Sequence, residues 1–393
     1  MLEVREIETK REMGNFVKFP FILYKNHPYW VPPILSDEKN TLDKSKNAAF
    51  DSAKARFWMA YEDGKPVGRV AAIFLEKYEE KWGQKRLRFG WLDFIDSKEV
   101  VFALLDTVWA WAKELDVCAV HGPMGFNDMD REGMLIEGFD RQGSMLTIYN
   151  EPYYNKYLEM YGFEKDVDWV EYSFETPEKN PELFTKMAKR VQEKTAYRLK
   201  TFANTKELVR WGHRIFEIYN KAYDHLYGAM PLNEKQIKAA INQYLKIIDP
   251  EFVLGIVDGN NRLVGFGVAM INMDDAVKKA KGRFLPFGFI PMLRAMRAKN
   301  TYITMLLIGL EPEVQKSGAV ALMLNRIVDT CHKRKINRIY CLPELEDNKE
   351  VQKLWKLFAT EIVRKRRVYI RYLKENAKMA YDYRTAQKKS QER

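Results

Sequence analysis

The sequence has few cysteines and no long hydrophobic run. Its three cysteines are odd in number and lack metal-ligand spacing, which argues against a disulfide framework or a metal site and favours a reduced compartment. No apolar run approaches the roughly 20 residues needed to span a bilayer. Residues 1–14 are charged from the start and lack the apolar core of a signal peptide. We therefore expect a cytoplasmic protein without a bound metal.

Acidic residues are outnumbered by basic ones, 54 to 65, which gives a formal net charge of +11. A basic balance suits a nucleic acid, an anionic lipid or a phosphate-bearing cofactor. Part of the charge lies in the polar stretch 364–393, and the chain has no helix-turn-helix, zinc-finger or RNA-binding signature, which argues against nucleic acid as a partner. The 46% hydrophobic content predicts a globular protein.

A faint repeat divides the chain. Residues 57–73 and 252–271 both read as an apolar run, a turn that begins Asp-Gly, and a second run opened by Val-Gly, the pattern of a β-hairpin. The equivalent glycines, Gly68 and Gly265, are 197 positions apart, half the chain length. The sequence thus predicts two copies of one fold. We expect domains at 1–176 and 196–375, a connection at 177–195 and a basic tail at 376–393.

The order of predicted elements is the same in both halves: strand, one or two helices, hairpin, strand, helix, strand, helix, strand. This order resembles the GNAT acyltransferase fold. The resemblance implies an α/β protein of two tandem GNAT-like domains, each a mixed sheet flanked by helices. In that family the sheet is splayed between its fourth and fifth strands, and acyl-CoA lies in the gap.

The second half contains a loop between an apolar strand, 304–310, and a helix. The loop resembles the GNAT pyrophosphate motif, Arg/Gln-x-x-Gly-x-Gly/Ala, since Gln315 and Gly318 match it while Val320 departs from it. Backbone N–H groups at a helix N-terminus form an anion site. The first half has residues 95–99 there, with acids and no glycine, so we expect a first domain without a phosphate loop. The resemblance implies acyl-CoA as cosubstrate, held by Ile308, Leu310, Gln315, Lys316, Ser317, Gly318, Ala319, Val320 and Asn348.

The resemblance also implies direct transfer of an acyl group to an amine. A backbone N–H near Ile308 or Leu310 would polarise the thioester carbonyl, and a carboxylate would accept the amine proton through water. The sequence leaves this carboxylate open among Glu344, Glu346 and Glu311. The helix position where GNAT enzymes often place a tyrosine acid holds Trp355.

A loop rich in glycine and acids, 122–140, lies between a strand and a helix of the first half. Its side chains could bind an amine or polyol headgroup, or simply cap nearby helices. This segment, together with Tyr-Trp-Val-Pro-Pro at 29–33 and Tyr-Gly-Phe at 161–163, resembles a bacterial family of uncharacterised two-domain GNAT-like proteins, some of whose relatives look like bacterial ceramide synthases. The candidate acceptor-binding residues are Asn127, Glu137, Asp140, Asn150, Tyr154 and Tyr223.

An apolar run flanked by lysine and arginine occupies residues 278–299, and its two prolines forbid one continuous helix. Such a segment suits a membrane surface or a long acyl chain, which would place the protein peripherally at the inner face of the membrane; it also suits a lid packed on the second core. The function we expect is acyl transfer from acyl-CoA to an amine, which could be a lipid amine. Two alternatives stay open: a non-catalytic binding module for a thioester or lipid, and an aminoacyl-tRNA-dependent transferase.

Overall fold

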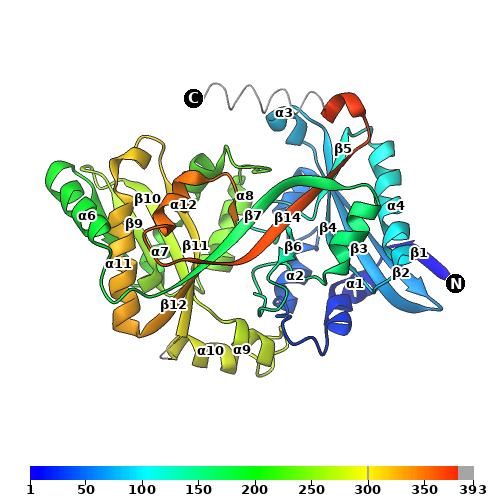
Figure 1. Cartoon of the computed structure of the whole chain (residues 1–393), viewed down its shortest axis with the longest axis horizontal. Helices are drawn as coiled ribbons and strands as arrows, with labels where there is room; N and C mark the ends of the chain where they lie inside the picture. Colours follow the sequence, from blue (N-terminus) through cyan, green and yellow to red (C-terminus); the bar gives the residue numbers. More distant parts are fainter. Residues whose placement is uncertain (299–300, 379–393) are drawn as a thin grey trace. The chain divides into compact units, whose positions relative to one another are not determined.

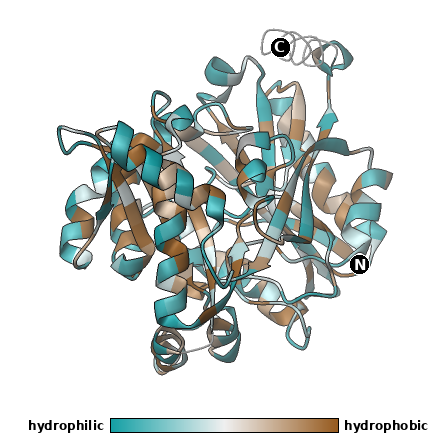
Figure 2. Ribbon diagram, turned by 60° about the vertical axis from the view of Figure 1, so that its left-hand side comes forward, coloured by the Kyte–Doolittle hydropathy of each residue, from teal (hydrophilic) through white to brown (hydrophobic). Residues whose placement is uncertain are grey.

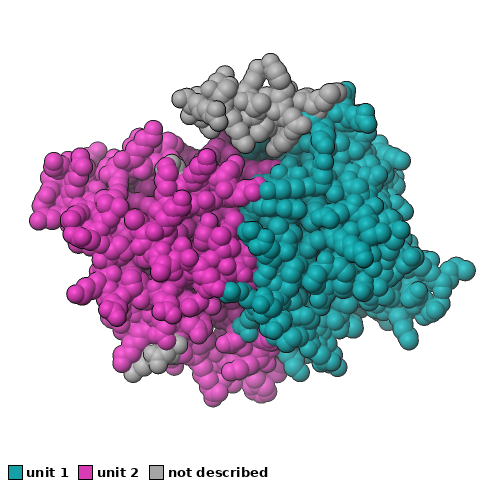
Figure 3. All heavy atoms as spheres, in the orientation of Figure 1, with its two compact units in different colours: residues 1–169, 281–284, 365–393 teal, residues 170–280, 285–364 magenta. Residues whose placement is uncertain are grey.

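The computed structural model describes residues 1–298 and 301–378, which divide into two compact units (Figure 3). Unit 1 comprises Met1–Trp169, Lys281–Phe284 and the chain from Lys365 onward. Unit 2 comprises Val170–Ala280 and Leu285–Arg364. Residue 299 of the predicted basic insert and most of the predicted tail lie outside the described residues. No helix among the described residues is long and apolar enough to cross a membrane.

Unit 1 is built on a mixed sheet in the order β1-β2-β3-β4-β5-β14, in which β4 and β5 are parallel. The long helix α4 packs its apolar stripe, which includes Leu104 and Val108, on the sheet. The elements are β1 (Leu2–Glu6), α1 (Lys10–Leu23), α2 (Leu35–Thr41), η1 (Ala48–Asp51), β2 (Ala53–Glu62), β3 (Lys65–Leu75), α3 (Tyr78–Trp82), β4 (Arg86–Phe94), α4 (Lys98–Glu114), β5 (Ala119–Gly122), β6 (Met134–Glu137), α5 (Tyr153–Met160) and part of β14 (Glu361–Tyr372).

Unit 2 repeats this plan in the order β7-β12-β11-β10-β9-β8, with β11 and β12 parallel. Its helices turn apolar residues toward the core and polar residues outward (Figure 2). The elements are part of β7 (Glu164–Glu175), α6 (Glu182–Lys194), β8 (Arg198–Thr201), α7 (Thr205–Tyr223), α8 (Glu234–Ala240), η2 (Ile241–Leu245), η3 (Pro250–Phe252), β9 (Val253–Val257), β10 (Leu263–Ile271), α9 (Asp274–Lys279), α10 (Phe289–Arg297), β11 (Thr301–Leu310), η4 (Gln315–Ser317), α11 (Val320–Arg334), β12 (Ile336–Cys341), β13 (Glu344–Leu345) and α12 (Lys349–Trp355).

The two halves of the sequence exchange their last strands. Strand β7 ends the first half, yet its C-terminal part pairs with β12 of unit 2. Strand β14 ends the second half, and its C-terminal part pairs with β5 and β6 of unit 1. Figure 1 shows both as long strands, green and red. The compact units therefore divide at other residues than the predicted domains.

Both predicted hairpins are confirmed. Glu62 pairs with Lys65, so the first turn contains only Asp63 and Gly64, whose positive φ angles of 47° and 78° match the right-handed twist of the strands. The predicted connection at 177–195 contains a helix instead of plain linker. Helix α6 forms because Phe184, Ala188 and Val191 recur at helical spacing and are buried in the unit 2 core; it lies along α11 (Figure 1).

Candidate functional site

Strand β11 has an open edge over its second half. It pairs with β10 as far as Leu310, but with β12 only as far as Met305, where the Leu342 N–H donates to the Met305 carbonyl at 3.1 Å. The register with β10 shifts by one residue at Leu306, which marks a β-bulge at this point. Strands β11 and β12 are the fourth and fifth strands of the repeat, so their parting matches the splay that the GNAT resemblance implies.

The hydroxyl of Tyr223 covers this open edge. It accepts a hydrogen bond from the Ile308 N–H at 3.3 Å and donates one to the Ile308 carbonyl at 3.2 Å. Both backbone groups of Ile308 therefore point away from β10. Tyr223 ends helix α7, and its ring stacks on Tyr219 with centroids 4.5 Å apart. The predicted acceptor residue Tyr223 thus meets the backbone predicted to bind the acyl group.

The loop after β11 is a short turn closed by its own polar groups. Gln315 donates its side-chain amide to the Leu310 carbonyl at 3.3 Å. The Ser317 hydroxyl donates to the Val314 carbonyl at 2.7 Å and accepts from the Ala319 N–H at 3.1 Å. Gly318 follows with φ at +78°, a left-handed conformation that costs a residue with a Cβ energy. The turn therefore requires glycine where the phosphate motif has it.

Three N–H groups of this loop are available to a ligand. Those of Lys316, Gly318 and Val320 meet no acceptor in the part of the chain that the structure describes, while the N–H groups between them are bonded within the loop. They stand at the start of α11, where the helix dipole favours an anion. The side chain of Val320 is buried in the unit 2 core, so its branched carbon belongs to the packing and does not point out of the loop.

Glu344 is the predicted carboxylate with the most unusual environment. It lies at the start of β13, just past the end of β12, and its Oε1 accepts the Trp355 indole N–H at 2.5 Å. Its buried Oε2 has no hydrogen-bond partner among the described residues. Burial raises the pKa of Glu344 to about 8, against the opposing effect of the Trp355 bond. A carboxyl with such a pKa can give or take a proton near neutral pH.

Glu311 is fully buried and surrounded by cations. Its Oε1 pairs with Arg214 and, at 3.2 Å, with Lys221, while its Oε2 lies 3.3 Å from Arg262. Burial alone would raise the pKa of Glu311, but the bonds from Lys221 and Arg214 outweigh it and hold the pKa below its usual value. This geometry argues against Glu311 as a proton acceptor, because three cations stabilise its ionised form.

The remaining predicted residues of this half are more ordinary. Glu346 is exposed on the turn after β13. Asn348 is the N-cap of α12, where its side chain accepts the Val351 N–H at 3.4 Å. Trp355, at the position of the family's tyrosine, is buried and packs against Phe174 with ring centroids 5.9 Å apart. Its N–H donates to Glu344, so Trp355 orients a carboxyl at the position where the resemblance implies a hydroxyl.

Most of the predicted acceptor residues of unit 1 have structural partners. Asn127 accepts the Met129 N–H at 2.9 Å, within its own turn. Asn150 is buried and bonds both backbone groups of Leu135. Glu137 pairs with Lys365 at 2.9 Å and is mostly exposed, as is Asp140. Their binding of an acceptor stays a prediction.

Three acids in the same loop of unit 1 are partly buried. Asp130 accepts the Phe126 N–H at 2.7 Å, a bond within the loop itself, since Phe126 is not at a helix end. Burial raises the pKa of Asp130 to about 6 and of Asp128 to about 7, and it also raises the pKa of Glu132 well above its ordinary value. The buried Arg88 guanidinium opposes the shifts of Asp128 and Glu132. The Asp130 carboxylate thus ties the loop together, whereas Asp128 and Glu132 each keep one buried oxygen without a hydrogen-bond partner among the described residues.

Tyr154 repeats in unit 1 what Tyr223 does in unit 2. Strand β4 parts from β5 after Phe89, whose carbonyl accepts the Met124 N–H at 2.8 Å. The fully buried Tyr154 hydroxyl accepts the Phe94 N–H at 2.9 Å and also lies 3.1 Å from the Phe94 carbonyl. Tyr24 adds a further hydroxyl at 2.8 Å. In unit 1 the open edge is therefore filled by tyrosine, whereas Tyr223 in unit 2 is only half-buried.

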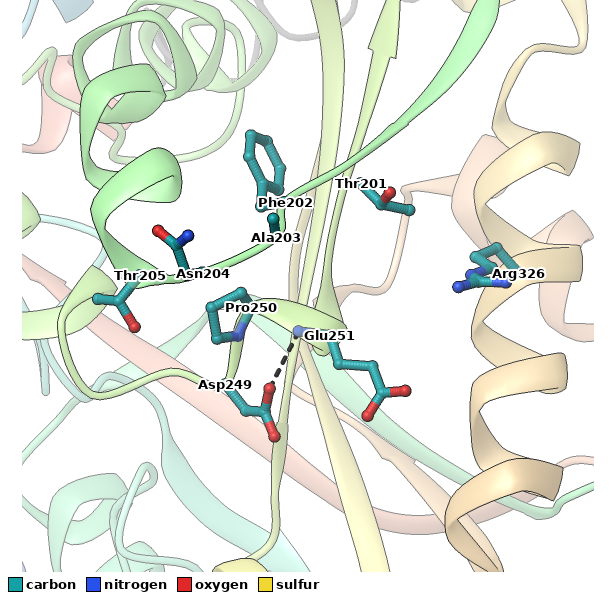
Figure 4. Close-up of a pocket in the computed structure, with 9 residues that line it drawn as sticks. All are labelled: Thr201, Phe202, Ala203, Asn204, Thr205, Asp249, Pro250, Glu251 and Arg326. Carbon is teal, nitrogen blue, oxygen red and sulfur yellow. Dashed lines mark hydrogen bonds between the residues drawn. The ribbon is translucent and has the colours of Figure 1, made fainter.

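A shallow pocket of unit 2, of about 330 Å³, lies near the start of α7 and not at the open edge (Figure 4). In its wall the Glu251 N–H donates to Asp249 at 3.0 Å. None of the predicted site residues lines it. Its lining residues are Thr201, Phe202, Ala203, Asn204, Thr205, Asp249, Pro250, Glu251 and Arg326.

No protein-family model matches the chain. Two curated proteins are similar to it. Protein YghO of Escherichia coli (strain K12) is 27% identical over 376 residues, 93% of this chain and 94% of that protein. The bacterial ceramide synthase of Caulobacter vibrioides is 24% identical over 321 residues, 80% of this chain and 82% of that protein.

Two solved structures are also similar. A tandem GNAT protein from the clavulanic acid biosynthesis pathway is 12% identical, with a TM-score of 0.55, 95% of this chain covered and 98% of that chain. A probable N-acyltransferase of Enterococcus faecalis V583 is 10% identical, with a TM-score of 0.54 and coverage of 95% and 73%. The chain therefore has the tandem GNAT fold, and the predicted fold class is confirmed.

Proposed function

We propose that the protein is an N-acyltransferase that takes an acyl group from acyl-CoA and transfers it to an amine. The observation that supports this most is the open edge of β11 followed directly by a loop with three available N–H groups. The loop N–H groups of Lys316, Gly318 and Val320 would hold the CoA pyrophosphate, and the Ile308 N–H would bind the acyl oxygen. One solved structure with this fold is named a probable N-acyltransferase, and one sequence relative is named a bacterial ceramide synthase, which supports the reaction class.

The chain's own groups suffice for the chemistry. The amine nitrogen forms a bond to the acyl carbon, the carbon–sulfur bond breaks, and CoA leaves as its thiolate. The amine proton passes through water to ionised Glu344, whose position is held by Trp355. Because its pKa is about 8, Glu344 ionises readily in mildly alkaline solution. Glu346 and Glu311 are weaker candidates, the first for its exposure and the second for its ion pairs.

The acceptor we propose is an amine on a lipid or a lipid precursor. The support is the similarity to a protein named bacterial ceramide synthase, which spans four fifths of both chains. The predicted acceptor residues of unit 1 and Tyr223 would bind this amine.

The test is binding of CoA, acetyl-CoA and palmitoyl-CoA to the full chain by calorimetry and thermal unfolding. A ligand at about 100 times its Kd stabilises a protein by about 2.7 kcal/mol, which is readily measured. Gly318→Ala should abolish or strongly weaken binding. Gly64→Ala is the matched control, because Gly64 has the same φ of +78° in a turn of unit 1, so both substitutions cost similar backbone strain. No binding of any CoA ester, or equal binding by both variants, would sink the proposal.

A second candidate function is a binding module that has lost its chemistry. One observation favours it, that Tyr223 bonds both backbone groups of Ile308; the resemblance adds that Trp355 stands where a tyrosine acid is expected. Tight binding of palmitoyl-CoA, with no CoA released in the presence of long-chain amines, would select this candidate over the enzyme.

A further inference from the structure

Unit 2 exposes a group of large apolar side chains on one short segment. Leu285, Phe287, Phe289 and Leu293 lie within nine positions, and 76, 72, 38 and 47% of their surfaces are exposed. Burying aromatic and aliphatic side chains of this size stabilises a protein, so leaving four of them in water is unfavourable. Such a group on a folded surface marks a contact with a partner or a membrane.

The segment is anchored from behind, so its outer face is fixed. Met292 of α10 is buried, and the Arg334 guanidinium donates to the Met296 carbonyl at 3.1 Å. Helix α10 also packs against α9, next to it in Figure 1. Phe289 and Leu293 are one turn apart and lie together on the neighbouring, exposed face of α10. Phe289 and Leu293 are thus exposed on a packed helix, and Leu285 and Phe287 lie on the turn that leads into it.

Cations border this face and acids are missing from the segment. Arg297 is one turn beyond Leu293 on α10, and Arg294 is beside it; both are exposed and have no ion pair among the described residues. Lys279 of α9 is exposed as well. The sequence has no Asp or Glu between Asp275 and Glu311. The charges thus complement a negative surface.

We propose that this face, formed by Leu285, Phe287, Phe289 and Leu293 with Arg294 and Arg297, docks on the surface of a bilayer that contains anionic lipids. The apolar side chains enter the boundary between headgroups and acyl chains, and the arginines meet the phosphates. A second copy of the chain is a poorer occupant, because a two-fold contact through this face brings its arginines against their own copies. The docking is independent of the proposed acyl transfer, because it needs no CoA ester.

The test is co-sedimentation of the full chain with vesicles of phosphatidylcholine alone and of phosphatidylcholine with about 30% phosphatidylglycerol, without CoA. We expect binding to the anionic vesicles only, and weaker binding as salt rises. Arg294→Gln and Arg297→Gln should each lower the partition coefficient about fivefold, which corresponds to about 1 kcal/mol per cation near the surface. Thermal unfolding of each variant verifies that it is folded.

Leu293→Ser should also release the protein, and Leu183→Ser on α6 is its control, because Leu183 is the same residue type with 49% of its surface exposed. Equal binding to neutral and anionic vesicles would overturn the proposal. So would equal behaviour of the two leucine variants, or a dimer in solution that Leu293→Ser dissociates while the wild type ignores vesicles.

Discussion

The hydroxyl of Tyr223 and the acyl oxygen of a bound thioester would compete for one donor, the Ile308 N–H. Tyr223→Phe removes the hydroxyl and keeps the ring stacked on Tyr219. In the free protein the substitution removes the hydrogen-bond partner of the Ile308 N–H and carbonyl, so both groups must bond to water instead. In the complex the acyl oxygen meets a donor that no longer has a rival.

The size of the effect follows from the two bonds, which at 3.3 and 3.2 Å are rather long. Each contributes about 0.5–1.5 kcal/mol net, so the free variant should lose about 1–2 kcal/mol of stability. Release of the N–H alone is worth about 1 kcal/mol, which is about fivefold in Kd for acyl-CoA. Free CoA has no acyl oxygen, so its Kd should stay within about twofold.

Calorimetric titration of wild type and variant with CoA and palmitoyl-CoA, without acceptor, measures both constants. Tighter binding of the ester alone supports competition at Ile308. Weaker binding of the ester would refute it and would make Tyr223 a donor to the acyl oxygen. Equal tightening of both ligands would also refute it, since the hydroxyl would then oppose the whole cofactor and not its acyl group.

Two further predictions concern the carboxylates. Burial raises the pKa of Glu344 from 4.5 to about 8, so the folded state binds the extra proton and stability should fall as pH rises between these values. Glu344→Gln should remove this fall in stability, which is about 1.4 kcal/mol for each pKa unit and is measured by urea unfolding at pH 5 and 9. The variant should also lose the rise of acyl transfer toward pH 8. The same pH dependence in wild type and variant would contradict the prediction. Glu311→Gln should cost about 2 kcal/mol of unfolding free energy, because it removes the buried charge that Arg214, Lys221 and Arg262 share, and only the two arginines keep a second carboxylate partner, Glu217 and Asp258. Glu313→Gln, a change at an exposed acid in the same loop, is the control and should cost less than about 0.5 kcal/mol.

The local elements were predictable because their signals are local. Asp63 and Gly64 specify a two-residue turn whatever surrounds it, and the residues around Gly318 specify a turn into a helix. The parting of β11 from β12 was reachable only through the resemblance, because no residue spacing encodes where two parallel strands separate.

The long-range contacts of the candidate site could not be predicted from residue spacing. Tyr223 and Ile308 are 85 positions apart, and Arg214 and Glu311 are 97 apart. Sequence alone placed Glu344, Glu346 and Glu311 on equal terms, and only their surroundings rank them. The strand exchange was missed for a similar reason: the residues at 368–373 predict a last strand, but not which strand it will pair with.

The exchange of strand β14 imposes an order on the synthesis and folding of this protein. When residues 1–169 leave the ribosome, the partner that β5 and β6 need is about 200 residues from being synthesised, many seconds later at usual elongation rates. Unit 1 must wait with an uncovered strand edge, and edges of that kind invite aggregation. A fragment that ends at the apparent midpoint of the repeat would keep this strand edge unpaired. The same fragment supplied with a peptide of residues 361–372 could pair the edge with that peptide.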